Sequence, residues 1–213
     1  KVQSTFQYEI GVKYSPKFWK LGDRLRDQYF ALVPADLPAG KYKWLIELIG
    51  PEDRQLGSFV YDKYFEVTVP DRLFEPPDDI NEVGIVLEDL AILSGYTIFN
   101  DFNEVDKSIE VTLVWNSSAN LTESYRVFVH LVDELGNLIS QSDNEPDEWN
   151  RPTTGWLSGE YINDTHKVVV PEDLNSGIYS IYVGLYNPTS LQRLSADGFD
   201  DGYIKLTEIY YSN

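Results

Sequence analysis

An internal repeat constrains the fold of this chain more than any other feature of its sequence. When the sequence is shifted by 137 residues, positions 19–51 align without a gap with positions 156–188, and eleven of these 33 positions are identical. Chance would give roughly two identities at average residue usage. Self-similarity of this kind predicts two related modules. The identical pairs include Trp19/Trp156, Gly22/Gly159, Asp27/Asp164, Gly40/Gly177 and Tyr42/Tyr179.

Each copy of the repeat contains a predicted β-strand that opens with a tyrosine. Apolar residues occupy every second position from Tyr42 to Leu48, and again from Tyr179 to Leu185. A period of two with one apolar face is typical of a strand with one buried side. The pattern Pro-x-Asp-Leu-x-x-Gly-x-Tyr precedes both strands. Its Pro ends the preceding strand, and its Gly allows positive φ in the turn.

This turn resembles the tyrosine corner of immunoglobulin-like and fibronectin-type sandwiches. In those folds the Tyr hydroxyl bonds back to the backbone a few residues upstream. The chain is therefore predicted to be all-β, with two tandem immunoglobulin- or fibronectin-III-like β-sandwich modules, the first of them abbreviated. The residues expected to define the structural motif are Trp19, Gly40, Tyr42, Trp156, Gly177 and Tyr179.

The two modules differ in length. Residues 83–213 hold about seven predicted strands, which is enough for a complete sandwich. Residues 70–82 are rich in proline and are predicted to form an extended, semi-rigid linker. Residues 1–69 hold predicted strands at 4–14, 24–33, 41–49 and 57–69 only, which is too few to close two sheets.

Two explanations for the abbreviated first module stay open. In one, the chain is a fragment or a minimal sandwich, and any missing strands lie upstream. In the other, a neighbouring chain donates a strand to the open edge. Strand donation would make self-association, or binding to other surface proteins, part of the function. The lack of Met, including at position 1, favours a processed product or an excised segment.

Composition excludes several classes of function. The chain has 17 Lys and Arg against 35 Asp and Glu, a net charge of −18 and a pI near 4.3. Nucleic-acid binding needs a basic face, so it is not expected. Without cysteine there is no disulfide, thiolate nucleophile or cysteine-type zinc site. No apolar run approaches the length of a membrane span.

Three Asn-x-Ser/Thr sequons begin at Asn116, Asn120 and Asn163. Such tripeptides also arise by chance. Together with the acidity and the absence of cysteine, they favour an extracellular or cell-surface protein of a prokaryote, with these asparagines as glycosylation candidates.

A set of short segments between residues 65 and 194 forms a recognisable pattern. The segments are Phe65 to Arg72, Phe74 to Pro77, Leu93 to Tyr96, Val111 to Trp115, Tyr125 to Asp133, Pro152 to Trp156, Gly159 and Glu160, Gly177 to Tyr179, and Val183 to Tyr186. The pattern resembles the extracytoplasmic β-sandwich repeats of large prokaryotic membrane-anchored proteins, which often follow the multi-pass part of glycosyltransferase-like proteins. The resemblance implies an outward-facing accessory β domain and no catalytic residue.

Few residues could support catalysis or metal binding. His130 and His166 both lie in predicted strands, so we expect structural roles for them rather than service as a catalytic base. No pair of carboxylates stands out for glycoside hydrolysis. Clustered acids at Asp197, Asp200 and Asp201, and again at 143–148, could ligate calcium. The alternative for both loops is a solvated acidic surface.

Aromatic residues offer a way to bind sugars, because ring faces pack on pyranose rings. Trp149, Trp156, Tyr161 and Tyr203 could form such a surface, with Trp149 and Tyr161 as the candidate stacking residues. Trp156 has a repeat partner in Trp19, which favours a role in the fold. Trp149 has no such partner and lies in a polar loop.

These observations predict a non-catalytic extracellular structural module of a prokaryotic cell-surface protein, surface layer or filament. It would act through contacts between modules and strand edges. The alternative is a carbohydrate-binding or accessory module of a membrane-anchored, glycan-active enzyme. Exposed coplanar aromatic rings would favour the alternative, and sheet pairing between chains would favour the filament.

Overall fold

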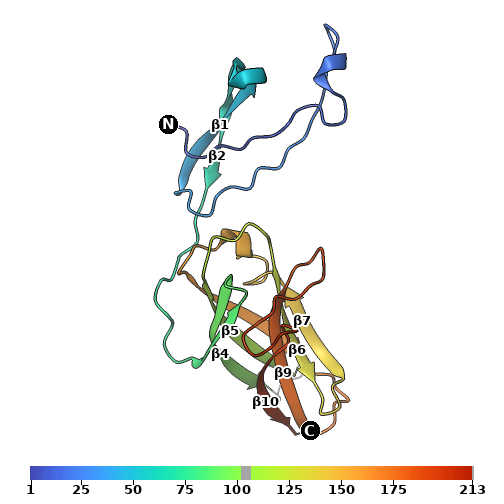
Figure 1. Ribbon diagram of the computed structural model, residues 1–213. Coiled ribbons are helices and arrows are strands. Elements are labelled where there is room, and N and C mark those ends of the chain that lie inside the picture. Colours follow the sequence, from blue (N-terminus) through green and yellow to red (C-terminus); the bar gives the residue numbers. More distant parts are fainter. Residues whose placement is uncertain (102–106, 213) are drawn as a thin grey trace. The chain divides into compact units, whose positions relative to one another are not determined.

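The computed structural model describes residues 1–101 and 107–212 and divides into two units. Unit 1 is Lys1–Pro70 and unit 2 is Asp71–Asn213. The predicted all-β architecture is confirmed, since every regular element longer than three residues in the described ranges is a strand (Figure 1). None of the helices in these ranges is long enough to cross a membrane.

Unit 2 is a sandwich of two four-stranded antiparallel sheets. One sheet has the order β3-β4-β5-β8 and the other the order β10-β9-β6-β7. The first contains β3 (Asn81–Leu87), β4 (Ala91–Asp101), β5 (Ser108–Ser117) and β8 (Tyr161–Val169). The second contains β6 (Arg126–Val132), β7 (Leu138–Asn144), β9 (Gly177–Tyr186) and β10 (Ile204–Tyr211).

Alternating side chains of the two sheets form one core in unit 2. Strand β5 contributes Trp115 and β6 contributes Val129, both fully buried. Strand β9 contributes every second residue from Tyr179 to Leu185, as its sequence pattern predicts. Each such side chain stabilises the fold by about 1.5–3 kcal/mol relative to exposure.

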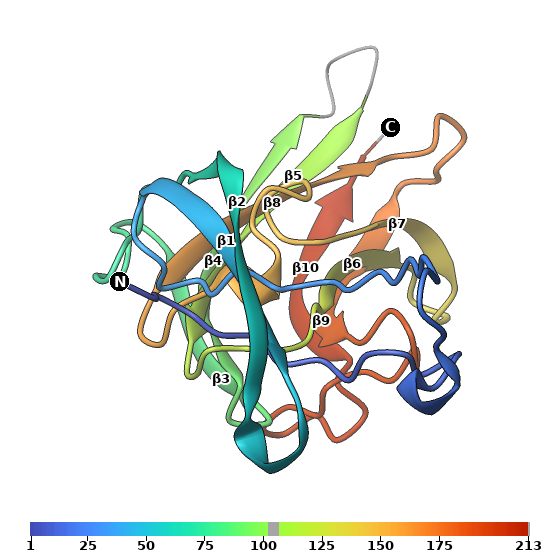
Figure 2. The same ribbon diagram turned by 90° about the horizontal axis from the view of Figure 1, so that it is seen from above.

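Unit 1 is much less regular. Strands β1 (Gly40–Ile49) and β2 (Gln55–Val67) form a two-stranded antiparallel sheet, joined through the short turn η2 (Pro51–Asp53). Residues 1–39 form coil with one 3₁₀ turn, η1 (Pro16–Phe18) (Figures 1 and 2). The expected strands at 41–49 and 57–69 are therefore present, with small shifts in their ends.

The strands predicted at 4–14 and 24–33 are absent, which corrects the sequence-based expectation. The shift of 137 residues places residues 1–7 on β7 of unit 2 and residues 24–32 on β8. Strand β7 pairs with β6, and β8 pairs with β5. Unit 1 has no equivalents of β5 and β6, so these alternating segments have no ladder that could satisfy their backbone groups.

The repeat is visible in hydrogen bonds as well as in sequence. The Tyr42 hydroxyl donates to the Pro38 carbonyl at 2.7 Å, and the Tyr179 hydroxyl donates to the Asn175 carbonyl at 2.8 Å. Both bonds run four residues upstream, as in a tyrosine corner. A Cβ at Gly40 or Gly177 would lie against the following Tyr ring.

The tryptophans of the repeat also make matching hydrogen bonds. Trp19 Nε1 donates to the Tyr14 carbonyl at 2.9 Å, and Trp156 Nε1 donates to the Arg151 carbonyl at 3.0 Å. Each Trp follows a 3₁₀ turn, η1 or η3 (Thr153–Gly155). They differ in exposure, because Trp156 is fully buried and Trp19 is 37% exposed.

Part of the segment expected to be a linker is bound to unit 2. The Tyr161 amide donates to the Leu73 carbonyl at 2.8 Å, and Arg72 donates to the Gly155 carbonyl at 3.1 Å. A Cβ at Gly95 would collide with the Ile80 side chain, so Gly95 lets this segment pass close over β4.

The tyrosine corner should contribute measurably to stability. We expect Tyr179→Phe to lower the free energy of unfolding of the chain by about 1 kcal/mol, because the bond to the Asn175 carbonyl is lost while the ring stays. Burial raises the pKa of the Tyr179 hydroxyl, so it remains a donor at neutral pH. Urea unfolding followed by tryptophan fluorescence measures the change. Tyr210→Phe, at a ring 69% exposed, is the control, and equal effects of the two variants would contradict the assignment.

Candidate ligand-binding face

The outward side of the β10-β9-β6-β7 sheet has an unusual set of side chains. Because Val127, Val129 and Leu131 point into the core, the alternate residues of β6 point outward. We call this surface the outer face. Its residues are Arg126, Phe128, His130, Asp143, Tyr182 and Tyr203, together with Trp149 and Arg193 from loops.

Stacked aromatic rings form the centre of the outer face. The rings of Tyr182 and Tyr203 are nearly parallel, with centroids 4.4 Å apart and an interplanar angle of 9°. Phe128 also stacks on Tyr203, with ring centroids 5.7 Å apart. The Arg193 guanidinium lies 4.6 Å from the Tyr203 ring centroid, which is cation–π geometry. Burial raises the pKa of Tyr203, so its hydroxyl is a neutral donor and acceptor.

A glycine makes this stack sterically feasible. Gly184 lies on β9 opposite Phe128, and a Cβ there would sit 2.6 Å from the Phe128 ring and collide with the Gly202 carbonyl. The absence of a side chain lets the ring and the loop before β10 close over the sheet. Gly184 therefore fixes the position of the aromatic cluster.

Polar groups lie beside the rings. His130 Nδ1 is 3.1 Å from the Tyr203 hydroxyl, and His130 Nε2 is 3.5 Å from Asp143 Oδ1. Among the described residues, Arg126 Nε and Asp143 Oδ1 are buried atoms without a hydrogen-bond partner. The Arg126 guanidinium lies 4.9 Å from the Trp149 ring.

A depression of about 300 Å³ adjoins the stack and shares Tyr182 with it. Its lining is rich in hydrogen-bonding groups from the β6–β7 turn, β9 and β10. A hydrogen bond from Lys205 to Glu208 raises the pKa of Lys205, and bonds from Asn137 lower the pKa of Asp133. Both groups are therefore charged at neutral pH. The lining includes Asp133, Glu134, Ser180, Tyr182, Lys205 and Glu208.

The structure separates the aromatic residues singled out from the sequence. Trp149 is 53% exposed and lies at the edge of the outer face beside Arg126, whereas Tyr161 begins β8 in the other sheet. Trp156 is fully buried. Sequence reasoning missed Phe128 and Tyr182, although both occupy the outward positions of strands whose alternation was already evident.

The acidic loop proposed for calcium lies near the β3–β4 turn. Asp197 and Asp200 line a depression with Glu88 and Asp89, and Asp201 accepts a bond from the Tyr203 amide. No three His, Asp or Glu side chains within residues 1–101 and 107–212 are grouped as a metal site would require. Calcium binding stays a prediction.

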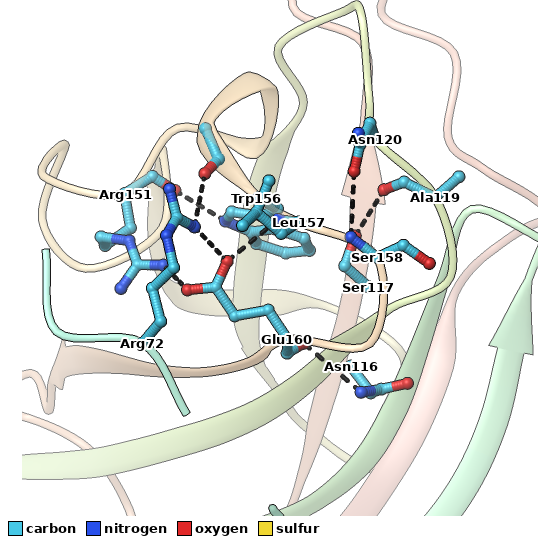
Figure 3. A network of polar contacts seen from close by, with 11 residues as sticks. Arg72, Asn116, Ser117, Ala119, Asn120, Arg151, Trp156, Leu157, Ser158 and Glu160 are labelled. Carbon is cyan, nitrogen blue, oxygen red and sulfur yellow. Dashed lines mark hydrogen bonds and ion pairs between the residues drawn. The ribbon is translucent and has the colours of Figure 1, made fainter. Parts of the chain in front are cut away.

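The three sequons lie on the β5 and β8 side of unit 2. Asn120 and Asn163 are exposed, and Asn116 is half-buried. Asn116 Nδ2 donates to the Glu160 carbonyl at 3.4 Å, and Asn120 Oδ1 accepts a bond from the Ser158 amide at 3.0 Å (Figure 3). Glycosylation of these residues stays a prediction.

A buried carboxylate ties the Trp156 loop to the start of unit 2. Glu160 is fully buried and forms ion pairs with Arg72 and Arg151, each at 2.5 Å (Figure 3). It also accepts a bond from the Leu157 amide at 2.9 Å. Asp23, its repeat equivalent, accepts the corresponding bond from the Lys20 amide. These partners all belong to unit 2, so the cluster is a structural clasp.

His166 belongs to a second internal cluster. Its Nδ1 is 3.1 Å from the Ser142 hydroxyl, and its Nε2 is 3.0 Å from Asp164 Oδ2. Asp164 also accepts bonds from Trp115 Nε1 and the Asp147 amide. His166 and Asp164 are fully buried, and together with Ser142 they connect β7 of one sheet to β8 of the other.

Comparison with known proteins gives little beyond the architecture. No family model and no curated protein matches the chain. Among solved structures, a β-glucuronidase from glycoside hydrolase family 2 is similar at 14% identity and TM-score 0.36, over 48% of this chain and 10% of that one. The C-terminal domain of Wzt is similar at 11% identity and TM-score 0.40, over 64% of this chain and 84% of that one. Similarities of this size carry no information about what the chain binds.

The clasp around Glu160 gives a test of the buried electrostatics. We expect Glu160→Gln to lower the free energy of unfolding by about 3–5 kcal/mol, because it leaves two largely buried guanidinium groups without a carboxylate. Thermal unfolding monitored by circular dichroism measures the loss. Glu208→Gln breaks the exposed pair with Lys205 and should cost less than about 1 kcal/mol. A similar loss in both variants would show that the clasp does not stabilise the fold.

Proposed function

We propose that this chain is a non-catalytic glycan-binding module of a prokaryotic cell-surface protein, and that unit 2 binds saccharides on its outer face. The observation that carries this proposal is the Tyr182–Tyr203 stack, with a depression rich in carboxylate, hydroxyl and ammonium groups beside it. This is the alternative function considered from the sequence; of its candidate residues, Trp149 and Tyr203 lie on the outer face, and Tyr161 lies in the opposite sheet.

The chemistry of the face suits a saccharide. Aromatic rings pack against the apolar C–H faces of sugar rings, while adjacent polar groups bind their hydroxyls. Asp133, Glu208 and Asp143 supply acceptors, and Lys205 and Arg126 supply donors. Hydrogen bonds to charged groups are stronger than neutral ones, so they can fix the orientation of a sugar stacked on Tyr182. These groups support binding, and the proposal includes no bond-breaking step.

A surface location fits the remaining features. A net charge of −18 keeps a surface module soluble, and exposed sequons at Asn120 and Asn163 suit a glycosylated exterior. The second candidate function, a structural module of a surface layer or filament, is favoured by a different observation. In unit 1 the apolar side chains of β1 are exposed, which is typical of a surface that binds another protein segment.

Binding to a glycan microarray, followed by calorimetry on the best polysaccharide, tests the proposal. We expect Tyr182→Ala to weaken binding by about tenfold or more, because it removes a central aromatic surface. Trp149→Ala, at the edge of the face, should weaken binding less.

Phe99→Ala is the matched control, since this aromatic residue is 65% exposed on β4 of the other sheet. It should leave affinity unchanged. Thermal unfolding of each variant checks that the sandwich is intact. The proposal is wrong if no glycan binds, or if Phe99→Ala weakens binding as much as Tyr182→Ala does.

A further inference from the structure

Unit 1 matches only the second half of unit 2. We call residues 81–137, which hold β3 to β6, the first half-module of unit 2, and residues 138–213, which hold β7 to β10, its second half-module. The 137-residue shift places Lys1 on residue 138 and β1 on β9, and β2 corresponds to β10 because each pairs antiparallel with that strand. The pairing registers agree, since Tyr42 lies opposite Phe65 as Tyr179 lies opposite Ile209.

The local turns and side-chain hydrogen bonds of unit 1 match those of the second half-module of unit 2. Its tyrosine corner and its Trp19 bond reproduce those of unit 2. In addition, the Tyr29 hydroxyl lies 2.7 Å from Asp27 Oδ2, and their repeat equivalents His166 and Asp164 make the same contact. The difference between the units therefore does not lie in these local turns.

The strands missing from unit 1 are the equivalents of β7 and β8. In unit 2 the partner strands of β7 and β8 belong to the first half-module. In unit 2, β7 and β8 pair with β6 and β5 respectively, across the boundary between the halves. Strands β9 and β10 pair with each other inside the second half-module. In unit 1 only the internal pair, β1 with β2, is present.

The face that a first half-module would cover is exposed in unit 1. Ile46 is 58% and Leu48 is 42% exposed, whereas their repeat equivalents Val183 and Leu185 are fully buried. Leu37 is the one buried hydrophobic residue of unit 1, all of whose residues are described. Strand β1 also has a single neighbour, while β9 has β6 on its other edge.

From these observations we infer that the free edge and apolar face of β1 are the docking site for a first half-module of the same type as residues 81–137. Its β6-like strand pairs antiparallel with β1, in the register that β6 has with β9. Apolar residues equivalent to Val127 and Val129 then lie opposite Leu48 and Ile46. Its β5- and β6-like strands also give residues 24–32 and 1–7 the ladders that they lack.

A second copy of this chain fits the site less well. Its own first half-module is engaged in unit 2, where Val127, Val129 and Leu131 are fully buried. It could donate that half-module only by opening its own sandwich. The occupant is therefore a first half-module that is not already paired, and this inference is independent of the glycan-binding proposal for unit 2.

A fusion protein tests the inference. A second copy of residues 81–137 is joined directly to Lys1 of the full chain, which restores the spacing between β6 and β7. Hydrogen exchange in residues 1–7, 24–32 and 43–49 should slow by about tenfold or more, because these amides enter new ladders. Binding of the dye ANS should fall as the face of β1 is covered. Val129→Asp in the added copy alone is the control, and it should abolish both changes.

Two results would overturn the inference. One is unchanged exchange in these segments of the fusion. The other is a dimer of the unmodified chain in sedimentation that Ile46→Lys converts to monomer, since a second copy would then occupy the site.

If the fusion aggregates, a double variant of the unmodified chain provides a second test. Ile46→Lys with Leu48→Lys should lower ANS binding without lowering the melting temperature, and a lower melting temperature would mean that the face is already packed within the chain.

Discussion

Pairing of strands across the boundary between two half-modules is the constraint on which this structure depends. A strand leaves a row of backbone donors and acceptors, and a neighbouring strand is the partner that satisfies the whole row. In unit 2 the ladders β6–β9, β6–β7 and β5–β8 all cross that boundary. They bring alternating apolar residues from both halves into one core, and the core then stabilises the ladders. Unit 1 has the same turns but lacks the crossing ladders, and its apolar residues remain exposed.

Polar clusters add to these ladders in unit 2, and one of their bonds crosses the same boundary. His166 on β8 contacts Ser142 on β7 and its neighbour Asp164, and Trp115 on β5 donates a bond to Asp164 from the first half. A chain without cysteine has no disulfide to connect its two sheets. Buried side-chain hydrogen bonds of this kind connect them instead. The clasp at Glu160 secures the segment around Arg72 in the same way. Because these groups are satisfied internally, we assign them to the stability of the sandwich and base the proposed glycan binding on the outer face.

Sequence patterns predicted the local parts of this architecture and failed where pairing is long-range. The tyrosine corners at Tyr42 and Tyr179, and the strands that follow them, depend on residues close in sequence, and the structure contains both. Residues 4–14 and 24–33 alternate just as clearly, but alternation describes only the side chains and does not reveal whether a partner strand exists. The outer face was missed for a related reason. Phe128, Tyr182 and Tyr203 come together only through the register of three strands, and the room made by Gly184 is evident only when Phe128 is known to lie opposite.

Hydrogen exchange of the unmodified chain measures whether strand formation depends on the crossing ladders, because the repeat provides matched segments in one molecule. The amides of β8 (Tyr161–Val169) should be protected, while those of their repeat equivalents at 24–32 should exchange faster by a factor on the order of a thousand. That difference would show that strand formation depends on the crossing ladder rather than on the local sequence. Comparable protection in the two segments would contradict the account.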